Sequence, residues 1–396
     1  MFAHGGDGGD SGKGSTATVT ELSYGGIDLS IEFPPDRHAA KMLGREIPLD
    51  SVNVVFVVLE SVGSRWTSLG SYGYQTTPTL AAEAAHGIVF DDFYAHIGRS
   101  SNSLASLLLS KFPKLGFRDM TDEDPEMPGT SLAQLFRDRG YRTGFVTPSN
   151  LAWARWRSFL DGRGFDDLRD EHDLTCGEEV SSWGVQDGCM VDDMVRWVGA
   201  EASRPFFLMA WTQQTHHPYE PTPGVPLLQL AREQVFDYYA FDRYLNVLHE
   251  TDRQLGRVFD LVRAAHLERD TVIVVTGDHG QAFGYPHKTF MQGRAIYEED
   301  VRVPLMIWSP RLARTGARSN IIGSHVDLAP TLYALAGVEA PGDLDGRSLV
   351  PALDGAPLAP ALAYAETGLW FTRRIPSLSA DERLPYISLL TDPIDA

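Results

Sequence analysis

The stretch NVVFVVLES, residues 53–61, decides the fold. Residues 54–59 are all apolar and mostly β-branched, without alternation of apolar and polar positions, which is typical of a strand buried on both faces of a parallel sheet. Further strands are predicted at residues 142–147, 205–212, 271–276 and 303–307. These segments are the expected strands of one large sheet.

Helical segments separate these strands. Residues 130–140 form an amphipathic pattern that ends in glycine, residues 231–266 predict a long helix with charged residues on its outer face, and shorter helices are predicted at 79–85 and 103–110. Strands that alternate with helices predict an α/β fold with a mainly parallel central sheet sandwiched by helices, and a small C-terminal appendage. Ligands in such folds bind at the carboxyl ends of the strands. The residues at those ends are 60–61, 147–150, 213–217 and 277–279.

The composition is that of a globular protein and excludes a mainly disordered chain. Of 396 residues, 43% are hydrophobic and 22% are charged. Lysine and arginine number 34 against 53 aspartate and glutamate, so the formal net charge is −19. That charge repels phosphates at long range, so no nucleic-acid partner is expected. A local basic pocket for one anionic group stays compatible with it.

Membrane and export signals are absent from the sequence as written. No run of 18 apolar residues occurs, and residues 1–20 are rich in Gly, Asp, Ser and Thr, which predicts a flexible tail rather than a signal peptide. The chain as written is therefore expected to be cytoplasmic. In that compartment Cys176 and Cys189 are expected to be two unpaired thiols, whereas an oxidising compartment would allow one bridge.

Acidic and imidazole side chains stand at the ends of two predicted strands. Glu60 ends the first strand, and Asp278–His279 end the strand in VIVVTGDHG, residues 272–280. Two carboxylates and an imidazole at one sheet edge suit a divalent cation such as Mn²⁺ or Zn²⁺ better than Ca²⁺. The structural alternative is that Asp278 caps the next helix and Glu60 pairs with an arginine.

A serine-rich turn, residues 98–103 (GRSSNS), precedes a helix of small residues. A serine at a helix N-terminus lies beside exposed amides that favour anions, and a metal could lower its hydroxyl pKa enough to make it a nucleophile. Taken alone, the pattern favours simple helix capping, because Ser and Asn are common N-cap residues.

Several loop residues are candidates for substrate contact. His216 follows the strand at 205–212 and could donate a proton to a leaving oxygen, although a lone loop histidine is also common at a surface. His287 and Lys288 could place positive charge beside a phosphate or sulfate. Trp153 and Arg155 suit an anionic polar ligand, and they equally suit plain packing.

The order of these motifs resembles the sulfatase-like branch of the alkaline phosphatase superfamily over residues 51–350. The matching segments are NVVFVVLES, SLGSYGYQTTPTLAAEA (68–84), SSNSLASLLLSKFP (100–113), THHPYEP (215–221), VIVVTGDHG, YEEDVRVPLMIWSP (297–310) and the stretch 324–353. The resemblance implies a flexible tail at 1–20, a lead-in at 21–50, a catalytic domain at 51–350 and a C-terminal extension at 351–396. Relatives often continue into a small sheet after the position of ETGLWFTRR, residues 366–374, so the extension is expected to be truncated.

The chain departs from sulfatases at the nucleophile. Sulfatases place Pro two residues and Arg four residues after a Cys or Ser that becomes formylglycine, whereas here Asn102 and Leu104 follow Ser100. Formylglycine is therefore not expected. The first metal segment is Glu60–Ser61 rather than two aspartates, and both changes resemble the lipoteichoic acid synthase and phosphoglycerol transferase group.

That resemblance implies one divalent metal, with Mn²⁺ favoured and Zn²⁺, Mg²⁺ or Ca²⁺ as alternatives. Its ligands would be Glu60, Ser100, Asp278 and His279, with Ser replacing the Thr nucleophile of that group. His216 matches the substrate-side histidine of that group. Substrate contacts are expected from Arg99, Trp153, Arg155, His287 and Lys288.

The predicted function is that of a metal-dependent hydrolase or transferase of phosphate esters, with a metal-bound serine nucleophile and a phosphoseryl intermediate. The alternatives are a sulfuric ester hydrolase and a catalytically silent binding protein. The expected substrate is an anionic small-molecule or lipid-linked phosphoester. Known members of the resembled group are membrane-anchored, so membrane association is expected only if an anchor lies outside this sequence.

Overall fold

The computed structural model describes residues 52–366, apart from residues 115–118, 177–179, 202, 234, 236–237, 291, 294, 313 and 360. It also describes the backbone of five short strands near the ends: β1 (Ala17–Thr18), β2 (Ser23–Tyr24), β3 (Ile27–Asp28), β4 (Glu32–Phe33) and β16 (Ile387–Thr391). Most of the predicted tail and lead-in lies outside the described residues. The predicted boundaries at residues 20, 50 and 350 stay predictions.

The central sheet has eight strands among the described residues, in the order β13-β6-β12-β11-β5-β10-β8-β9. Neighbouring strands from β11 to β9 are parallel, and β12 runs antiparallel to β11 and β6. The predicted α/β fold with a mainly parallel sheet is thus confirmed. The strands are β5 (Asn53–Leu59), β6 (Gly87–Phe90), β8 (Arg142–Val146), β9 (Asp167–Arg169), β10 (Phe206–Trp211), β11 (Thr271–Gly277), β12 (Leu305–Trp308) and β13 (Ala317–Ser319).

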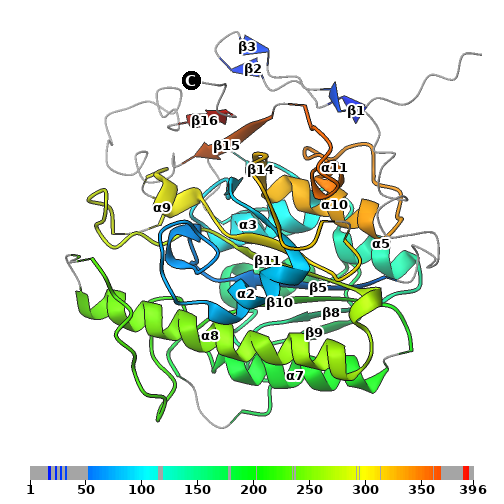
Figure 1. The fold of residues 1–396 in the computed structure, drawn as a ribbon. Coiled ribbons are helices and arrows are strands. Elements are labelled where there is room, and N and C mark those ends of the chain that lie inside the picture. The colour runs from blue at the N-terminus through cyan, green and yellow to red at the C-terminus, as the bar shows by residue number, and fades with distance from the viewer. Residues whose placement is uncertain are drawn as a thin grey trace, which may run out of the picture.

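Helices cover both faces of this sheet (Figure 1). Alternate side chains of β5 enter opposite layers, with Val54 and Phe56 in one apolar cluster and Val55 and Val57 in the other. The first layer includes α3 (Ser100–Leu109), α5 (Leu132–Asp138) and α10 (Leu328–Leu335), and the second includes α2 (Pro78–Glu83), α7 (Asp187–Ala200) and α8 (Tyr238–Ala264). Burial on both faces explains why β5 carries an unbroken apolar run.

Shorter elements complete the described fold. The helices are α4 (Met120–Glu123), α6 (Trp156–Leu160), α9 (Glu298–Val301) and α11 (Val350–Leu353). Among the described strands, four two-stranded sheets pair β7 (Phe93–Tyr94) with β14 (Gly323–Ser324), β15 (Leu362–Glu366) with β16, β1 with β4, and β2 with β3. The β15–β16 pair lies in the predicted C-terminal extension.

The expectation of two unpaired thiols is wrong in this structure. Cys176 and Cys189 form a disulfide, with their Cα atoms 5.7 Å apart. Cys189 lies in the first turn of α7, and the disulfide joins it to a cysteine 13 positions earlier in the sequence. The prediction rested on the lack of an export signal, which carries no information about this proximity.

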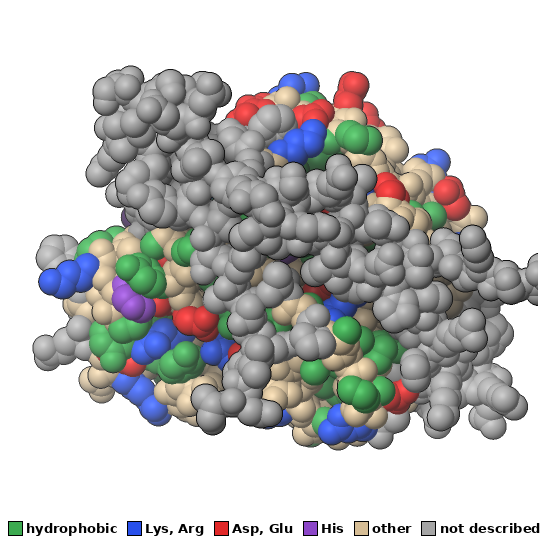
Figure 2. All heavy atoms as spheres, turned by 90° about the horizontal axis from the view of Figure 1, so that it is seen from above, with side chains coloured by type: hydrophobic (Ala, Val, Ile, Leu, Met, Phe, Trp, Pro, Cys, Tyr) green, Lys and Arg blue, Asp and Glu red, His purple; other side chains and the backbone are tan. Residues whose placement is uncertain are grey.

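Figure 2 looks onto the molecule from above the view of Figure 1. On the described part of this face, basic and acidic side chains are interspersed rather than gathered into one large patch of either sign. Among the described residues, no helix combines the length and the apolar character needed to cross a bilayer.

Candidate active site

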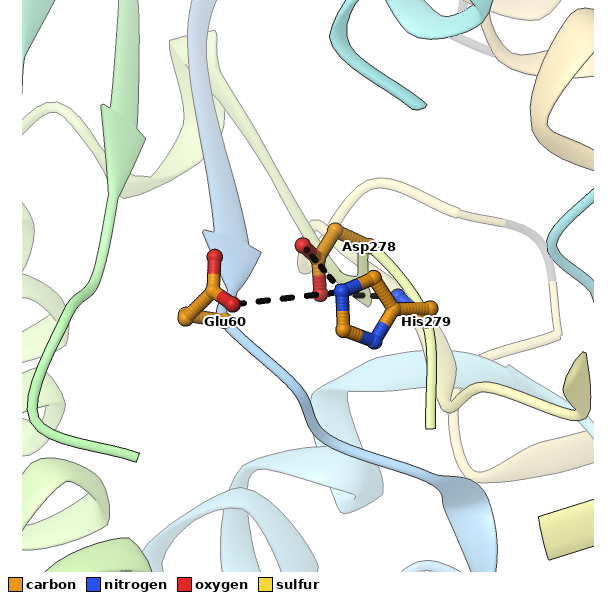
Figure 3. Close-up of side chains that lie close together, drawn as sticks. All are labelled: Glu60, Asp278 and His279. Atoms are coloured by element: carbon orange, nitrogen blue, oxygen red, sulfur yellow. Dashed lines mark hydrogen bonds and ion pairs between the residues drawn. The ribbon is translucent and has the colours of Figure 1, made fainter. Parts of the chain in front are cut away.

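Three buried side chains meet at the carboxyl edge of the sheet (Figure 3). Glu60 follows β5, and Asp278 and His279 follow β11, which pairs in parallel with β5 so that Gly277 lies opposite Leu59. This register brings the two strand ends together. One ligand atom from each of the three side chains lies within 4.8 Å of the others.

Asp278 carries an oxygen without a hydrogen-bond partner. Its Oδ1 accepts bonds from the amides of Ser61 and His279, each at 2.7 Å. Its Oδ2 is buried, has no hydrogen bond among the described residues, and lies 3.3 Å from His279 Nε2. Burial and the neighbouring Glu60 carboxylate raise the pKa of Asp278 well above its ordinary value. A divalent cation would supply the missing partner and remove this repulsion, so the donor set fits such an ion.

Glu60 is held in its ionised form. Trp211 Nε1 donates to its Oε2 at 3.0 Å, and Ser61 Oγ donates to its Oε1 at 2.8 Å. Burial raises the pKa of Glu60, but the electrostatic influence of the neighbouring His216 and His279 imidazoles, together with these hydrogen bonds, lowers the pKa on balance. The result is a carboxylate that is oriented before any ion binds.

His279 presents its Nε2 to the same cluster. Its Nδ1 lies 2.9 Å from the carbonyl oxygen of Gly280, an arrangement in which Nδ1–H donates and Nε2 keeps its lone pair. Burial lowers the pKa of His279 although Glu60 opposes this effect, which favours the neutral imidazole that binds metals.

Among the serines of residues 98–103, Ser100 is the one whose hydroxyl faces these side chains. Its Oγ lies 3.2 Å from Glu60 Oε2 and 3.3 Å from His279 Nε2. Arg99 is the N-cap of α3 and its side chain makes no capping bond, so Ser100 is the first residue inside the helix rather than its cap. Ser101 Oγ instead donates to Asp119 at 2.9 Å, and Ser103 Oγ donates to the carbonyl of Asp278 at 2.7 Å.

A pocket opens beside Ser100. Apart from the predicted metal ligands, its lining includes three predicted site residues, Arg99, Trp153 and His216. Among the described lining residues, Arg99 is the only arginine or lysine. The remaining lining residues are Glu60, Gly98, Thr147, Ser149, Asn150, Trp156, Trp183, Trp211, Gln213, His279 and Gln292.

Three predicted substrate contacts do not line this pocket. The chain turns through left-handed residues Ala154 and Arg155, which leaves the Arg155 side chain outside, with Nη1 3.4 Å from the carbonyl of Asp122. His287 pairs with Glu299 at 2.9 Å and stacks on Tyr297. Lys288 is exposed on the same loop. The geometry therefore gives no support to substrate contacts by Arg155, His287 and Lys288.

The predicted strand ends located Thr147, Asn150 and Gln213, whereas Trp183 was missed. Trp183 lies far from any predicted strand, on the segment between the two cysteines. The tryptophan and glycine between two cysteines, WG at 183–184, were the available signal, and they acquire meaning only once the disulfide is known.

The chain is similar to known sulfatases. The family model described as Sulfatase matches residues 52–338. N-acetylglucosamine-6-O-sulfatase of Bacteroides thetaiotaomicron is 37% identical over 413 residues, covering 78% of this chain and 72% of that protein. N-acetylgalactosamine-6-sulfatase of the dog, Canis lupus familiaris, is 25% identical over 369 residues, covering 77% of this chain. The chain spans only 66% of the length of that relative.

Phosphorus-handling proteins also appear among the similar chains. Phosphoglycerol transferase I of Xanthomonas campestris is 31% identical over 156 residues, covering 37% of this chain and 21% of that protein. The crystal structure of the lipoteichoic acid synthase LtaP from Listeria monocytogenes has a TM-score of 0.66 at 18% identity, covering 79% of this chain and 81% of that one. A phosphonate monoester hydrolase from Silicibacter pomeroyi has a TM-score of 0.62 at 18% identity, covering 80% of each chain. At these identities the structures establish a shared fold.

Proposed function

Because this chain belongs to the sulfatase family of the alkaline phosphatase superfamily, we propose that it is a divalent-metal-dependent hydrolase or transferase of phosphate esters. Ser100 is the proposed nucleophile. The observation that carries the proposal is the position of Ser100 Oγ, 3.2 Å from Glu60 and 3.3 Å from His279, inside a cluster with an orphaned carboxylate oxygen. That position is where a hydroxyl would be activated by a cation.

The metal would be held by Glu60, Asp278 and His279, with Ser100 Oγ beside it. When bound, such an ion lowers the pKa of a nearby hydroxyl and offsets negative charge on a transferring phosphoryl group. Mixed oxygen and nitrogen ligands support Mn²⁺ as the favoured ion, with Zn²⁺, Mg²⁺ and Ca²⁺ as alternatives.

The chain's own residues account for the remaining chemistry. Ser100 Oγ loses its proton to solvent and forms a bond to phosphorus as the bond from phosphorus to the leaving oxygen breaks. His216 donates a proton to that leaving oxygen, and Arg99 pairs with the non-bridging oxygens. The oxygen of water or of an acceptor alcohol then gives its proton to His216, attacks phosphorus and displaces Ser100 Oγ, which takes a proton from solvent.

His216 is suitably oriented for this role. Its Nδ1 lies 2.8 Å from the carbonyl oxygen of His217, so Nε2 is the ring atom available to a substrate in the pocket. Trp183 packs against the ring with centroids 4.3 Å apart. These two contacts fix the imidazole before a substrate arrives, which supports its assignment as the proton donor.

A second candidate is a sulfuric ester hydrolase, favoured by the relatives named sulfatases. The residues after Ser100 argue against it. Leu104 is fully buried in the apolar cluster, and Asn102 Oδ1 accepts the amide of Met120 at 2.9 Å. Neither position presents the Pro and Arg that formylglycine formation requires in sulfatases.

The substrate is proposed to be an anionic small molecule or a lipid-linked phosphoester, with no nucleic-acid partner. Membrane association is proposed only through a segment outside this sequence. The scarcity of positive charge supports this choice, since the described pocket lining contains one arginine rather than a basic groove.

The test is a paired assay of Mn²⁺-loaded wild type and Ser100→Ala on an aryl phosphodiester, an aryl phosphomonoester and an aryl sulfate. Phosphoester turnover that disappears in Ser100→Ala and survives in Ser101→Ala is the expected result. Sulfate turnover alone, with a mass shift at residue 100, would establish the second candidate. Absence of turnover on all three esters with every divalent metal would favour the silent binding protein.

A further inference from the structure

Trp183 sits on a turn that is fastened to the loop after β8. The carbonyl of Gly184 accepts a hydrogen bond from the amide of Val180 at 3.0 Å, and the amide of Val185 donates to the carbonyl of Pro148 at 2.9 Å. Gly184 has φ +143°, and a Cβ there would lie 2.1 Å from the oxygen of Pro148. The turn therefore requires glycine, both for its backbone conformation and for this close approach.

The chain is also anchored before and after this turn. The Cys176–Cys189 disulfide closes it, and Cys189 lies inside α7. At the start of that helix, buried Asp187 accepts the amide of Gln213 at 2.7 Å and the hydroxyl of Thr251 at 2.6 Å. We call residues 176 and 180–189 the disulfide segment. Its anchors fix where Trp183 points.

The ring of Trp183 is part of a continuous aromatic wall of the pocket. It lies 6.3 Å from the ring of Trp153 at an interplanar angle of 77°, and 4.3 Å from the ring of His216. Trp153 continues the wall to Trp156 at 5.7 Å, and Trp156 to Trp211 at 4.8 Å. Because Trp211 binds Glu60, the wall runs from the proposed proton donor to a proposed metal ligand.

We propose that Trp183 is a substrate-positioning residue that forms, with Trp153, an aromatic corner for a ring on the leaving alcohol, and that the disulfide segment holds this corner in place. Two rings at a steep angle offer one face and one edge, a shape that a flat or chair-shaped ring can contact on two sides. An acyclic polar alcohol such as glycerol covers little of either surface. The proposal rests on the proposed function and narrows its substrate class to esters of ring-bearing alcohols.

Binding of phosphonates tests the corner without turnover, since their carbon–phosphorus bond replaces the ester bond. Calorimetry on the Mn²⁺-loaded protein would compare phenylphosphonate, cyclohexylphosphonate and methylphosphonate. Wild type is expected to bind the ring compounds roughly three- to tenfold more tightly than methylphosphonate. Preference for phenyl alone indicates an aryl ester, and preference for both rings indicates a ring face as in a sugar.

Variants of Trp183 show whether this residue causes the preference. Trp183→Ala is expected to lose the ring preference while binding methylphosphonate as wild type does, and Trp183→Phe is expected to retain most of it. Unchanged methylphosphonate binding shows that the anion site is intact. A wild type without ring preference, or a Trp183→Ala variant that keeps it, overturns the proposal.

A separate experiment tests the role of the disulfide. Reduction of wild type by a phosphine, and the double variant Cys176→Ser/Cys189→Ser, are both expected to weaken ring binding and spare methylphosphonate binding. The reductant should have no effect on the double variant. Full ring preference in the reduced protein would refute the holding role of the disulfide. Ring preference that depends on Trp183 in a protein without phosphoester turnover would refute the proposed function and leave the corner standing.

Discussion

Trp211 donates its indole N–H to Oε2 of Glu60 at 3.0 Å, joining the ends of the neighbouring parallel strands β10 and β5. Both side chains are buried, so the bond is shielded from water. It holds Oε2, which is also the carboxylate oxygen nearer to Ser100 Oγ, at 3.2 Å, and leaves Oε1 on the side of His279, 3.9 Å from its Nε2. The indole thus acts on the proposed metal site through Glu60, without offering a ligand itself.

Replacing Trp211 should weaken metal binding more than it disturbs the fold. Trp211→Phe keeps an aromatic ring in the core and removes the N–H, so we expect metal affinity to fall roughly 10- to 100-fold. Competition with a metal-sensitive dye measures this. Trp308→Phe is the matched control, since Trp308 is equally buried and donates to Glu83 at 3.0 Å, on the opposite side of β11 from β5. Equal affinity losses in both variants would contradict the assigned role.

The carboxylates of Glu60 and Asp278 should repel one another when no ion lies between them. Asp278→Asn removes that repulsion, so the metal-free variant is expected to melt at a higher temperature than metal-free wild type. Manganese at a hundredfold excess over Kd should stabilise wild type by roughly 2.7 kcal/mol and the variant by much less. Thermal unfolding with and without Mn²⁺ measures both effects. Equal stabilisation of the two proteins would exclude Asp278 as a ligand.

His216 should matter most when the leaving group needs a proton. His216→Gln is expected to reduce turnover of an alkyl phosphate ester by roughly 10²- to 10⁴-fold, because glutamine cannot transfer a proton to the departing alkoxide. A nitrophenyl ester, which leaves as a stable phenolate, should lose far less. The measurement is kcat/KM for the two esters. His217→Gln provides a neighbouring control outside the pocket lining, and equal losses for both esters would argue against proton donation by His216.

Much of the fold and the meeting of Glu60, Asp278 and His279 could be predicted from the sequence because both depend on local patterns. The apolar run 54–59 signals burial on both faces, and the polar residues at strand ends, Glu60 and Asp278, follow from the edge rule for parallel sheets. The strand predicted at 303–307 begins instead at Leu305, after Pro304, whose missing N–H cannot donate to the sheet. The predicted helix at 231–266 is described from Tyr238 to Ala264.

Features that depend on tertiary contact could not be predicted. The disulfide and the position of Trp183 arise because residues 180–189 fold against the loop after β8, which no local period encodes. The outward position of Arg155 depends on a left-handed backbone at Ala154, a conformation that alanine rarely adopts and that its sequence does not signal. Pattern alone therefore located the edge of the sheet and part of the pocket lining, but not the contribution of Trp183.

Asp300 is a buried carboxyl group whose two oxygens lack hydrogen-bond partners among the described residues. Burial, with a smaller contribution from Glu299, raises its pKa to about 8. The ordinary value, which applies in the unfolded chain, is about 4. Between these two values the unfolded chain loses a proton that the folded protein retains. The contribution of Asp300 to the free energy of unfolding should therefore be greatest below pH 4, fall as pH rises toward 8, and stay constant above pH 8.

Asp300→Asn should remove this dependence. The variant is expected to be more stable than wild type at pH 8, and the difference in unfolding free energy should shrink as pH falls toward 4, by at most about 1.4 kcal/mol per pH unit. Urea unfolding of the metal-free proteins across pH 5–8 measures the difference. Asp260→Asn is the control, since that side chain is 78% exposed and should leave the slope unchanged. A difference between wild type and Asp300→Asn that grows as pH falls would mean that Asp300 is ionised in the folded protein, with a partner that the buried geometry does not provide.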